Sequence, residues 1–186
     1  MIAYRNCDYL TPLRTDMQTQ RRPGRYHRGT EAEPTQYLSL HPLGPHAEAM
    51  RRLDARTPER ARALDLRTWA LQIPGDGLVE VEFAEQWVDD DWSACHDLGD
   101  VLRESGAPGA IVPSGALPGT RNVVLFGPRS ALPYLWRPLR PADIPTSITG
   151  EHGSALESLV ARVRFRGQPH PGDITFDEPD WVYAAA

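Results

Sequence analysis

The segments Ala110-Ile111-Val112-Pro113-Ser114 and Arg121-Asn122-Val123-Val124-Leu125-Phe126 decide how the fold of this chain is interpreted. Both are short apolar runs, and a Pro/Gly-rich turn separates them, which predicts two strands. Ser114 ends the first run beside proline and glycine. Its hydroxyl can begin the turn or point outward into a pocket, and the residues alone leave both interpretations open.

Polar residues also interrupt apolar surroundings in two earlier segments. The first is Gly24-Arg25-Tyr26-His27. The second is Gln36-Tyr37-Leu38-Ser39, and Ala47-Glu48 follows shortly after it. A charge or hydroxyl is costly to bury unless it is paired or used. The three separated segments therefore predict one polar pocket.

Periodicity predicts the elements that carry these segments. Pro34 to His41 alternates as a half-buried strand does, with Tyr37 and Ser39 on one face. Pro45 suits the first turn of a helix, which the Arg-rich stretch 51–67 extends. Further helical spacing runs from Trp92 to the stop at Gly106, behind the acidic run 89–91. The remaining expected strands are 68–73 and 78–83, joined across the turn 74–77, and 159–165. This mixture is α+β.

The length and charge of the chain exclude several classes of protein. At 186 residues we expect one domain, residues 1–186, with a core of ordinary size. A net charge of −5 argues against a protein that coats nucleic acid, whose affinity would come from basic residues. All 20 basic residues are arginine, so Schiff-base chemistry on a lysine is excluded.

Neither a membrane location nor a metal site is expected. The N-terminus lacks an apolar signal region, no stretch approaches transmembrane length, and Cys7 and Cys95 form no disulfide framework, which predicts a cytoplasmic protein. His41 and His46 lack a metal-binding spacing and are separated by two prolines. The acidic run 89–91 is interpreted as the start of a helix.

Each candidate pocket residue has a plainer alternative. Arg25 can hold a pyrophosphate with its bidentate fork, or it can be a surface arginine. Tyr37 can stack on a substrate ring, or it can belong to the core. Glu48 can be catalytic, or it can form a routine helical ion pair with Arg51 or Arg52.

The order of these motifs and the residues that make them up resemble those of the RES-domain family. Gly24-Arg25-Tyr26 is similar to its Gly-Arg-Trp motif, with tyrosine in place of the usual tryptophan. Tyr37-Leu38-Ser39, Ala47-Glu48 and Val112-Pro113-Ser114, followed by Arg121-Asn122-Val123, match further motifs. The resemblance spans about residues 4–129, and 130–186 is a Pro-rich region with the C-terminal strand. The chain departs from the family at 126–129, where many members read Asn-Pro-x-His.

The resemblance implies a single RES domain related to the ADP-ribosyltransferase toxins, with mixed β-sheets and a few helices. It implies a toxin that destroys NAD by breaking the nicotinamide–ribose bond, with water or inorganic phosphate as acceptor. NAD would be a substrate, and no further cofactor is expected. Two alternatives stay open, a protein ADP-ribosyltransferase and an inactive NAD- or ADP-ribose-binding module. An antitoxin partner is expected, and a homodimer is possible.

The resemblance also assigns roles to residues. Glu48 would stabilise the oxocarbenium charge at ribose C1, a task that carboxylates perform in glycosyl chemistry. Arg25, helped by Arg5, would hold the pyrophosphate or an incoming phosphate. Tyr37 would stack on or orient the ribose, and Ser114 would hydrogen-bond to the nicotinamide half. Further substrate-binding residues are expected at Tyr26, Arg28, Ser39 and Asn122.

Overall fold

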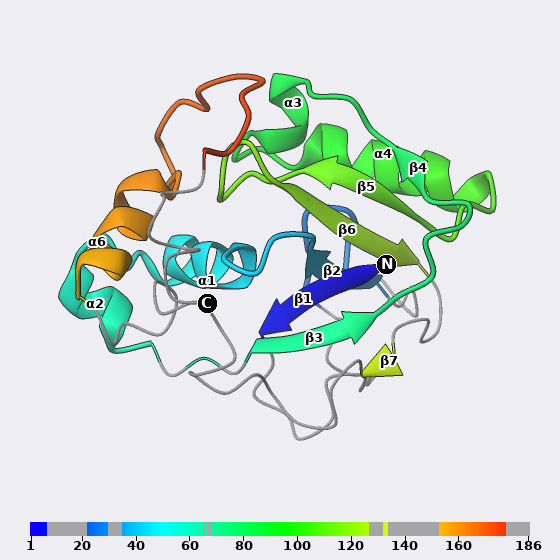
Figure 1. Cartoon of the computed structure of the whole chain (residues 1–186). Coiled ribbons are helices and arrows are strands. Elements are labelled where there is room, and N and C mark those ends of the chain that lie inside the picture. The colour runs from blue at the N-terminus through cyan, green and yellow to red at the C-terminus, as the bar shows by residue number, and fades with distance from the viewer. Residues whose placement is uncertain are drawn as a thin grey trace.

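The two predicted strands lie side by side in a mixed sheet. β5 (Gly109–Pro113) and β6 (Arg121–Phe126) are antiparallel, and β2 (Thr35–Ser39) pairs with the other edge of β6. The full strand order is β4-β5-β6-β2-β1-β3-β7. The remaining strands are β1 (Ile2–Asn6), β3 (Thr68–Gln72), β4 (Val79–Glu80) and β7 (Leu132–Pro133) (Figure 1).

The structure is a computed structural model that describes residues 1–6, 22–29, 35–64, 66, 68–126, 132–133 and 153–177. Cys7, most of the polar run 14–22, the departure at 127–129 and the tail after 177 lie outside this part of the chain. The helices are α1 (Gly44–Leu53), α2 (Pro58–Arg62), α3 (Glu85–Val88), α4 (Ser93–Glu104) and α6 (Gly153–Arg162). The α+β class is therefore confirmed.

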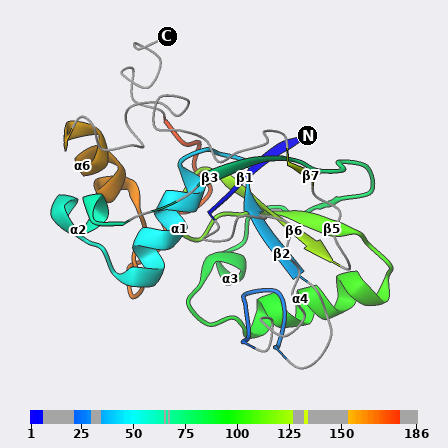
Figure 2. The ribbon, with the colours of Figure 1, turned by 90° about the horizontal axis from the view of Figure 1, so that it is seen from below.

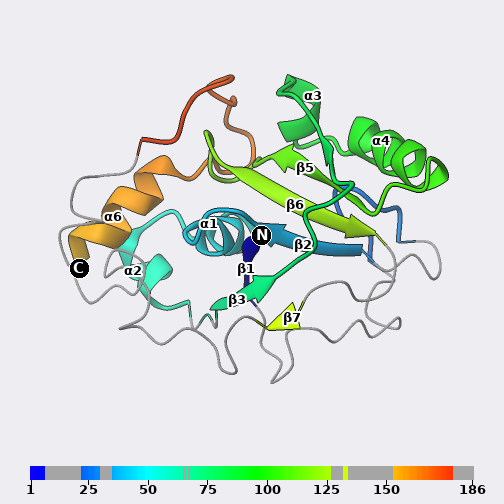
Figure 3. The ribbon, with the colours of Figure 1, turned by 45° about the vertical axis from the view of Figure 1, so that its right-hand side comes forward.

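Alternation along the strands gives the sheet two apolar faces. Leu38 and Val123 point to one face, where they pack with residues of β1 and β3. Val112 and Val124 point to the other face, where Cys95 of α4 and Tyr26 cover them. Cys95 is fully buried. Figures 2 and 3 show α3 and α4 alongside β5 and β6. The helices α1, α2 and α6 form a second group on the side of the molecule away from α3 and α4.

Helix α1 begins as predicted but ends early. Pro45 occupies its first turn, and its buried side packs into a second apolar cluster with α6. Asp54 then adopts a left-handed conformation with φ of 52°, which stops the helix. A new helix, α2, begins after Thr57, whose side chain caps it by accepting from the Arg60 N–H. The Arg-rich stretch is thus two helices with a break between them.

The predicted hairpin of 68–73 with 78–83 is wrong. β3 lies between β1 and β7, whereas β4 lies at the opposite edge, parallel to β5. A Pro-Gly-Asp-Gly turn permits a hairpin, but pairing is decided by which edge is available. The edge of β3 is taken by the full length of β1, where Tyr4 lies opposite Ala70. The chain after the turn therefore crosses to the other side of the sheet.

The predicted last strand at 159–165 is also wrong. Residues up to Arg162 belong to α6, and the chain is irregular after it. Leu159 and Val163 are four residues apart and both pack against α1, which is a helical spacing. A short apolar run does not distinguish a strand from a buried helix segment, and here tertiary packing decided for the helix.

Candidate active site

Strand register brings two of the predicted pocket residues, Ser39 and Asn122, into one row. Tyr4 lies opposite Ser39, Ser39 opposite Asn122, and Asn122 opposite Val112, so four neighbouring strands each place one residue on the same face. A cavity of about 390 Å³ lies over this row. Helix α1, the Gly24–Tyr26 segment and Trp92 form its walls. The predicted residues that line it are Arg5, Arg25, Tyr26, Tyr37, Ser39, Glu48 and Asn122.

Glu48 is held by the sheet and not by its own helix. Asn122 Nδ2 donates a hydrogen bond of 2.9 Å to Glu48 Oε1. No other hydrogen bond to Glu48 occurs within the described residues, so one carboxylate oxygen is available to a ligand. Glu48 is the only acid lining the cavity in the part of the chain that the structure describes. The routine helical pair with Arg51 or Arg52 is not what the structure shows.

Arg25 is presented by a tight turn. Gly24 and His27 exchange two backbone hydrogen bonds of 3.0 and 3.3 Å. A Cβ on Gly24 would lie 2.5 Å from the His27 ring, which explains why glycine stands here. Arg25 Nη1 donates to the carbonyl oxygens of Asp89 at 2.6 Å and of Trp87 at 3.3 Å. These bonds hold the guanidinium at the cavity wall.

Tyr37 is locked as a neutral phenol. Its hydroxyl oxygen accepts the Tyr26 N–H at 2.8 Å and lies 2.9 Å from His27 Nδ1. His27 Nε2 lies 2.9 Å from the Arg22 carbonyl, which can only accept, so Nε2 carries a hydrogen. In a neutral ring, Nδ1 then accepts the phenolic proton. Burial raises the Tyr37 pKa, so Tyr37 can position a ligand but cannot act as a base.

Two predicted residues are not brought to the cavity. Ser114 is buried, and its hydroxyl accepts the Leu117 N–H at 3.1 Å, which is the turn interpretation. Arg28 lies on the surface and forms ion pairs with Asp97 and Asp100 of α4. Their positions do not favour direct contact with a substrate.

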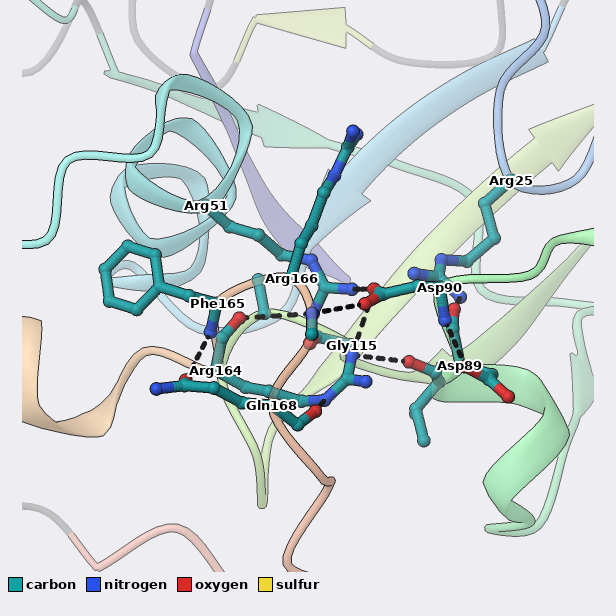
Figure 4. Close-up of polar contacts among 12 residues, drawn as sticks. Arg25, Arg51, Asp89, Asp90, Gly115, Arg164, Phe165, Arg166 and Gln168 are labelled. Atoms are coloured by element: carbon teal, nitrogen blue, oxygen red, sulfur yellow. Dashed lines mark hydrogen bonds and ion pairs between the residues drawn. The ribbon is translucent and has the colours of Figure 1, made fainter.

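An ionic network behind the cavity, in which two buried arginines meet the exposed Asp90, was not expected from the sequence (Figure 4). Arg51 donates to the Gly115 carbonyl and pairs with Asp90, which also lies 3.5 Å from Arg164 Nη1. Burial, and the positive charges of Arg164 and Arg25, lower the Arg51 pKa to about 10. Asp90 therefore belongs to this network, and only Asp91 serves the helix start, by accepting from the Ser93 N–H at 3.0 Å.

Positive charge dominates the cavity wall. Beside Glu48, five arginines among the described residues line it: Arg5, Arg25, Arg51, Arg52 and Arg166. Arg51 is partly neutralised by Asp90. Such a cavity suits a ligand that carries several negative charges, because guanidinium groups bind phosphate oxygens in bidentate fashion. The single carboxylate suits a positive charge on the same ligand.

Comparison with known families agrees with this geometry. The family model of the RES domain matches residues 2–141, more than half of the chain. The chain is a member of the RES-domain family. A solved chain from the "M.tuberculosis MbcT-MbcA toxin-antitoxin complex" superposes on this RES domain with a TM-score of 0.60. That match has 18% sequence identity and covers 76% of this chain and 85% of the other, which shows a shared fold.

Two further results concern curated relatives and membrane-spanning helices. No curated protein matches the chain. Within the described residues, no helix is both long and apolar enough to span a membrane.

Proposed function

We propose that this RES domain degrades NAD by breaking the bond between nicotinamide and ribose. The observation that carries the proposal is the Glu48–Asn122 pair, which lies in one cavity with several arginines. NAD has a pyrophosphate that matches the arginines and a cationic nicotinamide ribose that matches the carboxylate. Membership of the RES-domain family supports the same assignment.

In the proposed reaction, the C1–N bond breaks and its electron pair leaves with neutral nicotinamide. Positive oxocarbenium charge develops at ribose C1. The Glu48 carboxylate stabilises this charge with the oxygen that Asn122 does not engage, and it orients the acceptor or the 2-hydroxyl. Water or inorganic phosphate then forms the new C1–O bond and loses a proton to the Glu48 carboxylate or to solvent, which gives ADP-ribose or its 1-phosphate.

The remaining cavity residues bind and orient. Arg25 and Arg5 hold the pyrophosphate, and the Tyr37 ring packs against the ribose. Ser114 acts indirectly in this scheme, because its hydroxyl organises the turn that contains Gly115. A Cβ on Gly115 would lie 3.1 Å from Arg25 Nη2, so the glycine in this turn leaves space for the Arg25 guanidinium.

We further propose that the protein is a toxin that an antitoxin restrains. Uncontrolled loss of NAD would starve the cell that makes the protein, so an inhibitor is needed. The structural likeness to a chain of a toxin–antitoxin complex supports this proposal. The inhibitor would act by covering the arginine-rich cavity with acidic groups.

The proposal is tested by incubating the purified protein with NAD, with and without inorganic phosphate. We expect release of nicotinamide together with ADP-ribose or ADP-ribose 1-phosphate, measured by chromatography. Labelled NAD incubated with lysate, followed by mass spectrometry, detects transfer to proteins instead. NAD that binds but stays intact would indicate an inactive binding module. NAD that neither binds nor reacts with the folded protein contradicts the proposal.

A further inference from the structure

A segment beyond the matched family region reaches the cavity. The RES-domain match ends at residue 141, yet Arg166 lines the cavity together with residues of the motifs. Arg166 follows α6, on the irregular stretch that runs past the turn between β5 and β6 (Figure 3). None of the family motifs includes this position, so its presence at the wall is a separate observation.

Hydrogen bonds on every side hold this segment in place. The Arg164 N–H donates to the Ala116 carbonyl at 2.9 Å, and Arg164 Nη1 donates to the Val88 carbonyl at 2.8 Å. The Gly167 N–H donates to Asp90 Oδ2 at 2.7 Å. Arg166 thus lies between two anchored neighbours. Its backbone is fixed although its side chain is exposed.

The side chain of Arg166 extends away from the network and toward the cavity (Figure 4). Its guanidinium carbon lies 6.0 Å from the centre of the Trp92 ring. The guanidinium carbon of Arg25 lies 5.7 Å from the same ring. Trp92 is therefore within cation–π range of two arginines that line the cavity, and a bound anion would offset their like charges.

Arg166 differs from Arg25 and Arg51 in how its side-chain donors are used. Arg51 is committed to Asp90 and to the Gly115 carbonyl, and Arg25 donates to the Asp89 carbonyl. The guanidinium of Arg166 makes no hydrogen bond or ion pair with any residue that the structure describes, and the Arg166 backbone carbonyl accepts from Arg56 Nη2 at 3.2 Å. All five of its N–H donors remain available to a ligand.

We propose that Arg166 is a substrate-binding residue that donates to phosphate oxygens, and that Arg25, Trp92 and Arg166 together form a phosphate clamp. The inference rests on the proposed function for the source of the phosphate. That source is either the pyrophosphate of NAD or the inorganic phosphate that acts as acceptor. The arms of one experiment separate the two.

The experiment compares the parent with Arg166→Gln and Arg166→Lys. We expect Arg166→Gln to raise one KM by about tenfold or more, because a charge-assisted bond is lost, while kcat changes little. A raised KM for NAD assigns the clamp to the pyrophosphate, and a raised KM for phosphate assigns it to the acceptor. The KM of Arg166→Lys should lie between those of the parent and of Arg166→Gln, because lysine keeps the charge but lacks the planar fork.

Arg62→Gln is the matched control, since it removes an exposed arginine of α2 that does not line the cavity. Binding of inorganic pyrophosphate, measured by calorimetry, tests the clamp without any turnover. Weaker pyrophosphate binding by Arg166→Gln than by Arg62→Gln supports the clamp even if the parent leaves NAD intact. Equal pyrophosphate binding and unchanged KM values, or a parent that binds no pyrophosphate, overturn it.

Discussion

At the scale of single residues, the candidate chemistry depends on Glu48 and the residue that holds it. Glu48 is exposed to the cavity, and Asn122 engages only one of its oxygens. Asn122 Oδ1 is itself buried without a partner within the described residues, so the amide is oriented by its bond to the carboxylate alone. The free carboxylate oxygen is therefore presented at a defined place, which is what charge stabilisation requires.

Glu48→Gln should slow NAD turnover by 10²–10³-fold, about 3–4 kcal/mol, because transition-state charge stabilisation is lost. The shape is retained and the Asn122 bond can still form, so folding should be nearly unchanged. Steady-state kinetics with nicotinamide release as readout measures the effect. Glu104→Gln, at the exposed end of α4, is the control. A Glu48→Gln variant within tenfold of the parent would remove Glu48 from the catalytic role.

Arg25→Lys should be nearly as damaging as Arg25→Ala. A lysine ammonium lacks the planar fork, so it cannot reproduce a bidentate grip on phosphate oxygens while Nη1 stays bonded to the Asp89 carbonyl as in the parent. A raised KM alone would show that Arg25 binds the ground state, and a lowered kcat that it binds the transition state. Full activity in the lysine variant would leave Arg25 only a diffuse electrostatic effect.

At the scale of elements, Asp90 joins three parts of the chain that are far apart in sequence. It accepts from Arg51 of α1 and from the Gly167 N–H, and it lies near Arg164 after α6. Burial alone would raise the Asp90 pKa. The Gly167 N–H and the two arginines outweigh that effect and hold the pKa below its ordinary value. The carboxylate thus stabilises the fold only while it is ionised.

The sign of the pH dependence follows from this depressed pKa. Above the unfolded value, about 3.9, Asp90 is ionised in both states and its contribution to stability is complete. As the pH falls through the lower pKa of the folded state, the unfolded chain binds the proton more readily and the contribution is lost. The free energy of unfolding should therefore decrease as the pH drops below about 4.

Asp90→Asn should lower the free energy of unfolding at pH 7 by about 1.5–3 kcal/mol, the range for bonds to charged groups. It should also flatten the loss of stability below pH 4. Urea denaturation at a series of pH values measures both effects. Asp97→Asn breaks an exposed pair with Arg28 and should cost at most about 1 kcal/mol. Equal losses in the two variants would contradict a structural role for the network.

At the scale of the whole molecule, the cavity lies where the sheet, α1 and the C-terminal segment meet. The motifs provide its floor and two walls, and the stretch after α6 provides another. A partner that covers this opening would block all the proposed chemistry at once. The basic stretch 14–28 is a surface on which acidic groups of such a partner would pair with arginines, and the structure describes it only from residue 22. Within it, Arg28 is already paired with acids of α4.

Expression of the intact chain without an antitoxin should arrest growth and lower cellular NAD, because the proposed enzyme consumes NAD without control. Colony formation and extracted NAD are the two readouts. Expression of Glu48→Gln at the same level is the control and should do neither. If the intact chain and Glu48→Gln both leave growth and NAD unchanged, the toxin proposal is wrong while the family assignment stands.

The sequence by itself determined the local elements and most of the cavity. Alternation predicted β2, the apolar runs predicted β5 and β6, and helical spacing predicted α1 and α4. These features are local, because a period of 2 or 3.6 residues is read within one segment. Ser39 and Asn122 then converged because the register of neighbouring strands places them in one row, and Glu48 joined them because Asn122 donates to its carboxylate.

Only the tertiary structure decided what depends on contacts between distant segments. Ser114 turned inward because the Leu117 N–H was available to it. β4 joined β5 because both edges of β3 were occupied. Asp90 met Arg51 and Arg164 across 39 and 74 residues of chain, and no local pattern announces such pairs. Arg166 reached the cavity for the same reason: its place follows from the packing of its neighbours and not from its own sequence.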